Sequence, residues 1–364
     1  GPPNPSLPYA FGAAGGTLGT ISGALFGLVF LLILMKIYYP KMKRRLLQDN
    51  NGYTESYKEV FAVLFLTIAP VILSTAINNI NDTIDQGIFS SIMVAQGHTE
   101  KVAAEYLGMF TGKYNTLIYT PQAVANALGA SLIPSLTVTV AKGTKEELKS
   151  KINMVIRLVM LIAIPSCIAF MVLPKQIMSL LYVGNISTPA KMLQIGAITV
   201  VLYCFSTVTN AILQGLNRMS APVKHGAISL GIHLVAVVIM LAVFRLGIYS
   251  LIFGNIVFAF TMCVLNARAI RKVAGYRQEV KKTILIPLAA SILMGIVAIV
   301  LWNGLTTVMA DKLATILTIF VSIAVYAVSL LKMGCLTPEE IKALPKGELL
   351  LRLFQKIRLI KEEL

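Results

Sequence analysis

The sequence has few charged residues, and few of those are acidic. Charged residues make up 13% of the 364 residues, and only 16 residues are Asp or Glu. Soluble domains average about a quarter charged residues. Hydrophobic residues make up 56% of the chain, and its mean hydropathy is +0.77. This balance excludes an ordinary soluble protein and predicts an integral membrane protein.

Residues that build disulfides, metal sites and catalytic centres are also scarce. The cysteines have no C-x-x-C spacing and lie mostly in apolar runs, at Cys167, Cys204, Cys263 and Cys335, so we expect buried thiols. The three histidines include no i, i+4 pair that would hold zinc. The sequence contains no phosphate-binding G-x-x-x-x-G-K-[ST] motif and no acid–base constellation. It therefore predicts no metal, no cofactor and no enzymatic activity.

Long apolar runs dominate what is present. A helix that crosses about 30 Å of hydrocarbon needs about 20 apolar residues. Nine runs of this kind occur, at about 10–35, 60–86, 106–140, 152–173, 192–214, 226–244, 249–267, 283–303 and 313–331. The predicted fold class is an all-α, polytopic membrane bundle of about nine transmembrane helices.

The basic residues alternate between the connecting segments. If the N-terminus lies outside, segments on the cytoplasmic side hold 25 of the 32 lysines and arginines. Cytoplasmic loops of membrane proteins carry such an excess. The net charge of +16 is then a topology signal rather than a nucleic-acid-binding face. We expect a multi-pass protein of the cell membrane with a cytoplasmic C-terminus.

The first span carries a stripe of glycines, Gly15, Gly19, Gly23 and Gly27. Small residues spaced in this way let helix backbones approach closely in lipid. Helix packing is the favoured interpretation, and a direct ligand role is the alternative.

The second and third spans hold the polar residues that are most costly in a membrane. Asn78, Asn79, Asp82 and Asp85 end the second span, and Lys113 opens the third. Intramembrane ionisable groups usually face a polar cavity and are candidates for function. An Asp82–Lys113 ion pair that only joins two helices is the alternative interpretation.

Further amides extend this predicted substrate cavity, at Asn115, Asn126, Asn210 and Gln214. The last two stand four residues apart on one helical face and either line the cavity or hydrogen-bond between helices. Gly112, Pro121, Gly129 and Pro134 interrupt the third span and permit bending. Bent helices around a site at mid-membrane are typical of transporters.

Other cations are predicted to lie at the membrane surface. Arg157 is only about a turn and a half into its span, so we expect it to snorkel to the interface beside a lipid phosphate. The segment after the first span contains Lys43, Arg44 and Arg45, and the tail contains Arg352 and Lys356 opposite an apolar stripe. Both segments fit an anionic membrane surface or packing against the protein's own cytoplasmic face.

Four short motifs resemble a known family. They are GKYNTLI at 112–118, ALGASLIPS at 127–135, AILQGLN at 211–217 and LPKGE at 344–348. In this order they are similar to the Gram-positive MurJ-type and stage V sporulation protein B branch of the MOP flippases. The resemblance covers almost the entire chain.

The resemblance implies two six-helix lobes and a terminal helix pair that move a lipid-linked cell-wall precursor from the inner to the outer leaflet. On this pattern the chain comprises the last helix of an incomplete first lobe (1–35), a cytoplasmic linker (36–58), the second lobe (59–275), the terminal pair (276–332) and a cytoplasmic amphipathic tail (333–364). About five first-lobe helices are absent, and Gly1 is not an initiator Met, so we expect a processed chain or a fragment. Lys113 is the cation that the family pattern places near the start of the third span.

The predicted function is a flippase for lipid II or another undecaprenyl-pyrophosphate glycan, working by alternating access. A cation-coupled multidrug or small-solute antiporter of the same superfamily, and a non-transporting scaffold for cell-wall or spore assembly, are the alternatives. The predicted partners are the lipid-linked glycan, anionic lipids and a coupling ion, and not nucleic acid.

Overall fold

The computed structural model describes residues 7–48 and 56–335, and every regular element in these ranges is helical. Eight of the described helical segments are long and apolar enough to cross a membrane. The remaining predicted span, 60–86, lies inside the long helix α2. The all-α, polytopic fold class is therefore confirmed. The tail with Arg352 and Lys356 lies outside the described residues.

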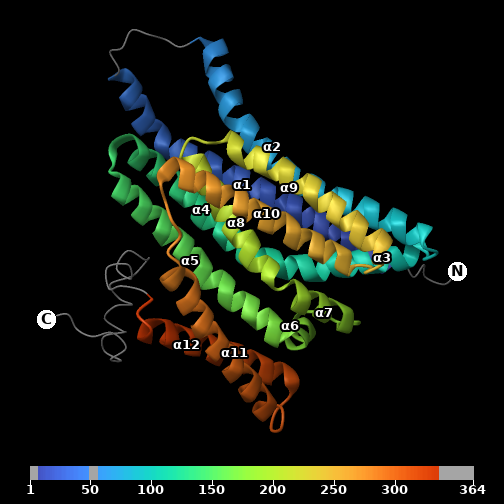
Figure 1. Cartoon of the computed structure of the whole chain (residues 1–364). Coiled ribbons are helices and arrows are strands. Elements are labelled where there is room, and N and C mark those ends of the chain that lie inside the picture. Colours follow the sequence, from blue (N-terminus) through green and yellow to red (C-terminus); the bar gives the residue numbers. More distant parts are fainter. Residues whose placement is uncertain (1–6, 49–55, 336–364) are drawn as a thin grey trace. The chain divides into compact units, whose positions relative to one another are not determined.

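The helices follow one another through short connections (Figure 1). Their bounds are α1 Leu7–Leu47, α2 Tyr57–Ala95, α3 Glu100–Met109, α4 Thr116–Lys142, α5 Lys145–Val172, α6 Pro174–Leu181, α7 Ser187–Gly196, α8 Ile198–Gly215, α9 Ser220–Val238, α10 Tyr249–Ala274, α11 Ile286–Leu305 and α12 Asp311–Lys332. Three π-helical segments extend them, η1 Phe110–Asn115, η2 Ile239–Val243 and η3 Lys281–Leu285.

The chain divides into two compact units, Gly1–Val63 and Leu64–Leu364. The first unit contains α1, which continues to Leu47 and so makes much of the predicted 36–58 linker helical. Lys43, Arg44 and Arg45 are exposed near the end of this helix. A Cβ built on any glycine of the predicted stripe would meet no described atom within 4 Å.

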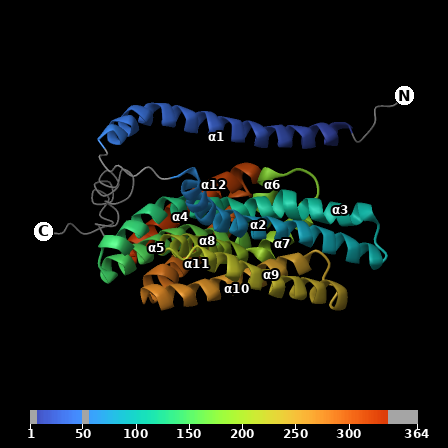
Figure 2. The same ribbon diagram turned by 90° about the horizontal axis from the view of Figure 1, so that it is seen from above.

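In the second unit α8 is the central helix, packed against α4, α5 and α10, while α9 runs beside α10 (Figure 2). Glycines bring α4 and α8 together. A Cβ on Gly129 would lie 2.9 Å from the Cβ of Ala211, and one on Gly215 would lie 2.9 Å from the Cβ of Leu136. At these two positions only glycine permits this backbone separation. Gly129 therefore serves close packing, whereas the sequence suggested a point of bending.

Local signals set the helix ends near the basic loops. Thr144 and Glu147 form a reciprocal capping box at the start of α5. Gly275, with φ of +61°, ends α10 in the left-handed conformation. The terminal helices α11 and α12 pack on one another, and α11 also packs on α5. The helices α3 to α12 thus belong to one compact unit.

One predicted span was wrong, and two others contain a feature that was not predicted. The span 192–214 is divided between α7 and α8, because α6 and α7 are short helices that join α5 to α8. The spans 106–140 and 226–244 include the π-helical segments η1 and η2. A π-helical turn adds one residue to the repeat, which apolar periodicity does not reveal.

Candidate functional site

A cavity of about 560 Å³ lies within the second unit, between α2, α4, α8 and α10. Its polar lining consists of Asn81, Asp82, Tyr119, Gln122, Asn126, Tyr203, Ser206, Thr207, Asn210 and Gln214. Amides, hydroxyls and one carboxylate therefore face a space surrounded by apolar helices. Polar groups at such a position carry a desolvation cost in free energy unless they hydrogen-bond to one another or to a ligand.

Several lining groups are held in place by hydrogen bonds between helices. The Tyr119 hydroxyl donates to Asp82, at 3.4 Å from Oδ1 and 3.3 Å from Oδ2. Gln122 donates to the Thr207 hydroxyl over 3.1 Å, which links α4 to α8. These bonds fix the orientation of the side chains and leave their remaining donors and acceptors for a ligand.

Asn210 is oriented from α10. Asn266 Nδ2 donates to Asn210 Oδ1 over 2.8 Å, and Asn266 Oδ1 lies 2.7 Å from His225 Nδ1. Because its oxygen is engaged, Asn210 keeps its amide N–H groups as donors at the cavity wall. Asn126 and Gln214 line the same cavity.

A second polar group lies behind the cavity, among α2, α9 and α10. His233 Nε2 and Asp85 Oδ1 share a 2.7 Å hydrogen bond, and the two side chains are 0% and 1% exposed. One turn earlier on α2, Asn81 donates to Asn255 over 3.5 Å. We call Asn81, Asp85, His233 and Asn255 the inner polar cluster.

The inner polar cluster is incompletely satisfied. Buried atoms without a hydrogen-bond partner in the described part of the chain include Asn81 Oδ1, Asp85 Oδ2, His233 Nδ1 and Asn255 Nδ2. Buried polar groups normally have partners. This concentration of unsatisfied atoms beside a cavity marks a place for a function rather than a simple link between helices.

Lys113 does not take the place that the sequence predicted. Its Nζ donates to the carbonyl oxygens of Asn185, at 3.0 Å, and Val183, at 3.5 Å, and lies 5.8 Å from the Tyr182 ring centroid. Asp82 has Tyr119 as its partner instead, so the Asp82–Lys113 ion pair, which was the alternative interpretation, is not among the described contacts. No lysine or arginine is among the described residues that line the cavity. Lys113 opens its span next to the α6–α7 connection, and these carbonyls lie within reach of its long side chain.

The other predicted cavity residues are divided. Asp82, Asn126, Asn210 and Gln214 line the cavity. Asp85 lies behind it in the inner polar cluster, and Asn115 is buried at the end of η1 without lining it. The side chains of Asn78 and Asn79 lie outside the described part of the structure.

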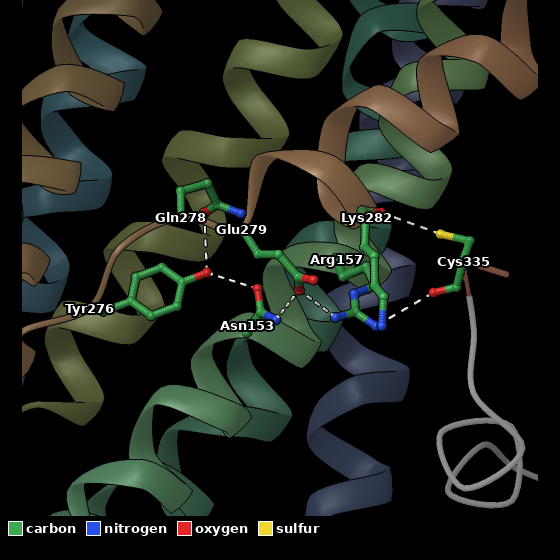
Figure 3. Close-up of polar contacts among 7 residues, drawn as sticks. All are labelled: Asn153, Arg157, Tyr276, Gln278, Glu279, Lys282 and Cys335. Atoms are coloured by element: carbon green, nitrogen blue, oxygen red, sulfur yellow. Dashed lines mark hydrogen bonds and ion pairs between the residues drawn. The ribbon is translucent and has the colours of Figure 1, made fainter. Parts of the chain in front are cut away.

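Arg157 is buried by protein, which corrects its predicted position beside a lipid headgroup. Its side chain is 6% exposed and its Nη2 lies 2.7 Å from Glu279 Oε2 (Figure 3). Its Nη1 also donates to the Cys335 carbonyl over 3.4 Å. The sequence interpretation placed Arg157 near the interface but missed Glu279, which is more than a hundred residues away in the chain.

The surroundings of Glu279 complete this contact, which we call the Glu279 clamp. Asn153 Nδ2 donates to Glu279 Oε2 over 2.6 Å, and the Tyr276 hydroxyl donates to Asn153 Oδ1 over 3.0 Å. The hydrogen bonds from Asn153 and Arg157 lower the pKa of Glu279 below its ordinary value. The clamp joins α5, the loop 275–280 and the end of α12 (Figure 3).

Sequence reasoning also overlooked Tyr119, Tyr203, Ser206, Thr207 and His233. Tyrosines, hydroxyl residues and single histidines are common in apolar helices, so the sequence alone does not single these residues out. The packing of α4, α8 and α9 shows that they lie at the cavity or beside Asp85. The thiols of all four cysteines are buried, as predicted. The described residues contain no cluster of three potential metal-ligating side chains.

Comparison with known proteins gives the family. A model of the lipid II flippase MurJ family matches residues 11–323. The lipid II flippase MurJ of Bacillus subtilis (strain 168) is 30% identical over 319 aligned positions. The match covers 82% of this chain and 55% of that protein. The chain spans about half the length of this curated relative. The MurJ part of the motif resemblance is thereby confirmed, while a role in sporulation stays a prediction. Since the family model covers most of the sequence, the chain belongs to the lipid II flippase MurJ family.

Proposed function

We propose that this chain takes part in moving a lipid-linked cell-wall precursor across the membrane, and that its cavity receives the polar part of that precursor. The observation that carries the proposal is the cavity of about 560 Å³, lined by amides and hydroxyls inside an apolar bundle. Membership of a flippase family supports a transporter rather than an enzyme.

The lining favours one part of such a substrate. Asn126, Asn210 and Gln214 offer amide donors and acceptors, which suit sugar hydroxyls and peptide groups. Asp82 is the charged residue of the described lining, and a carboxylate repels a pyrophosphate. We therefore assign glycan or peptide recognition to this cavity and do not assign binding of the pyrophosphate to it.

The proposal includes a coupling cation that binds at Asp82 and Asp85 of α2. Asp82 faces the cavity, and Asp85 lies one turn further in with an unpartnered Oδ2. Carboxylates within a membrane attract a proton or a metal cation, and such sites serve as relays in transporters. Transport by the Asp82→Asn variant should lose its dependence on an imposed ion gradient.

We also propose that the C-terminus is cytoplasmic and that the basic loops contact anionic lipids. The loops that would then be cytoplasmic carry most of the lysines and arginines, whereas the opposite loops carry only Lys101, Lys175, Lys191, Arg245 and Lys312. The positive-inside bias supports this orientation. Labelling of a cysteine introduced at Lys145 or Lys175 from either side of the membrane would test it.

The direct test reconstitutes the full chain in liposomes that contain a fluorescent lipid-linked precursor and measures its appearance in the outer leaflet. Asn126→Leu with Gln214→Leu should lower the rate about thirtyfold, because the two lost hydrogen bonds are worth about 1 kcal/mol each. Gln86→Leu, which removes an exposed amide of α2 outside the cavity lining, is the matched control. Equal rates in the double variant and the control would refute the assignment of the cavity.

A further inference from the structure

A second pocket, separate from the candidate cavity, lies at the end of α10. It encloses about 370 Å³ and is bordered by Arg268, Arg271 and Arg277. The first two arginines belong to the last two turns of α10, and the third follows the Gly275 turn. We call it the arginine pocket.

The three guanidinium groups are available to a ligand. None of them has a hydrogen bond or an ion pair with another group in the described part of the chain. Glu279 lies only two residues after Arg277, but its carboxylate is engaged by Arg157 and Asn153, at 2.7 and 2.6 Å. No acidic residue is among the described residues that line the pocket. The rim is therefore positively charged and uncompensated.

A buried donor adds to this rim. Gln278 Nε2 is buried, lines the pocket region and has no partner among the described residues. The Tyr276 hydroxyl is shared between Asn153 Oδ1, at 3.0 Å, and Gln278 Oε1, at 3.3 Å, so the amide nitrogen of Gln278 is the end without a described partner (Figure 3). Burial raises the pKa of Tyr276 to about 12, so the tyrosine stays a donor at neutral pH.

The floor of the pocket has the opposite character. Ile156, Phe205 and Ile270 supply apolar surface from α5, α8 and α10. A ligand that satisfies both parts has an anionic group at the rim and a hydrocarbon portion on the floor. Arginine forks match phosphate oxygens in particular.

We propose that the arginine pocket binds the phosphate headgroup of an anionic membrane lipid, with part of its acyl chain on the apolar floor. The pocket lies at the end of the bundle that the basic residues mark as cytoplasmic, so this orientation rests on the proposed topology. Occupancy would also stabilise the Glu279 clamp, because Tyr276 and Gln278 line the pocket and Tyr276 bonds to Asn153. The proposal does not depend on transport.

Native mass spectrometry of the full chain in nonionic detergent tests the proposal, with phosphatidylglycerol, phosphatidylcholine and inorganic phosphate as three separate additions. Phosphatidylglycerol should be retained and should raise the Tm, whereas phosphatidylcholine and inorganic phosphate should do neither. An equal response to inorganic phosphate would indicate a soluble phosphate ligand and would overturn the lipid assignment.

The variant Arg268→Gln with Arg271→Gln should retain about a hundredfold less phosphatidylglycerol, since each of the two lost hydrogen bonds to a charged group is worth about a factor of ten. Its matched control is Arg218→Gln with Lys272→Gln, which removes the same charge from a different pocket of the same region. Equal loss in both variants would mean general surface electrostatics and would overturn the proposal.

A third variant guards against misfolding. Arg268→Lys with Arg271→Lys keeps the charge and removes the forked donors, so retention should fall between the parent and the glutamine variant. Retention at the parental level in both the lysine and the glutamine variants would overturn the proposal. Because lipid retention is measured without flipping, its failure and the failure of the proposed function are distinguishable.

Discussion

The Glu279 clamp and the inner polar cluster contain similar pairs in opposite surroundings. Arg157–Glu279 and Asp85–His233 are both separated by 2.7 Å. Glu279 has a second donor in Asn153, and 36% of its side chain is exposed to solvent. Asp85 and His233 are almost fully buried and each keeps one atom without a partner in the described part of the chain.

This difference separates a structural contact from a candidate functional one. The clamp joins three segments with most of its carboxylate satisfied, and solvent can hydrate the rest. Burying the inner polar cluster costs more desolvation free energy than a link between helices requires, because apolar residues could join α2 and α9 equally well. The predictions below test that distinction.

The largest effect is expected for Asp85→Ala, which leaves His233 buried and without its partner. Removing one member of a buried pair costs about 3–5 kcal/mol. Asp85→Ala with His233→Leu should be within about 1 kcal/mol of the parent, since no buried polar member of the pair remains. Unfolding of the purified chain in detergent, followed by circular dichroism, measures both. If the single and double variants are equally stable, the pair is hydrated and the comparison fails.

The next effect is expected for Glu279→Ala, at the lower end of the same range. It leaves the buried Arg157 guanidinium without a carboxylate, at a cost of about 3 kcal/mol. The same unfolding measurement applies, with the exposed Glu105→Ala as control, which should change stability by less than about 0.5 kcal/mol. A loss as small as that of the control would mean that Arg157 reaches water without Glu279.

Arg157→Met should cost less than Glu279→Ala, about 1.5–2 kcal/mol, which is the lower part of the range for a hydrogen bond to a charged group. The carboxylate left behind is partly exposed and keeps its bond from Asn153. The order of the two variants in the unfolding midpoint tests which partner is buried. A reversed order would contradict the geometry of the clamp.

Acid should weaken the clamp by a smaller amount. The pKa of Glu279 is lowered in the folded chain, so its stabilising contribution is present above the ordinary value of about 4.3 and is lost as the pH falls through the folded pKa. Between pH 6 and pH 3 the stability of the parent should therefore fall more than that of Glu279→Gln. Parallel curves for the two proteins would show that Glu279 has the same pKa folded and unfolded.

The smallest effect is expected for Lys113→Ala. Its bonds to two backbone carbonyls in the α6–α7 connection are partly exposed, so their loss should cost less than about 1 kcal/mol. The rate of precursor transport should stay within about twofold of the parent. A folded Lys113→Ala protein that transports nothing would return Lys113 to the role that the sequence suggested.

Much of the fold was readable from the sequence because the bilayer imposes long apolar runs. Most spans fall within single helices, and four of the polar residues singled out from the sequence line one cavity, namely Asp82, Asn126, Asn210 and Gln214. Polar residues in such runs are rare enough to be noticed one by one.

What could not be read were the partners. Arg157 of α5 pairs with Glu279 in the loop after α10, and Asp85 pairs with His233, which looked isolated in the sequence. Lys113 and Asp82 seemed matched in depth, yet each binds a different neighbour. These pairings depend on how α2, α5 and α9 rotate about their axes, which local periodicity leaves open.

The glycine contacts between α4 and α8 have a consequence for motion. Gly129 of α4 faces the Cβ of Ala211, Gly215 of α8 faces the side chain of Leu136, and Gln122 bonds to Thr207 across the same interface. Because a Cβ at either glycine would clash with the facing side chain, the two helices pack closely, and we expect them to move as one body. We therefore expect any opening of the cavity to occur along the walls formed by α2 and α10.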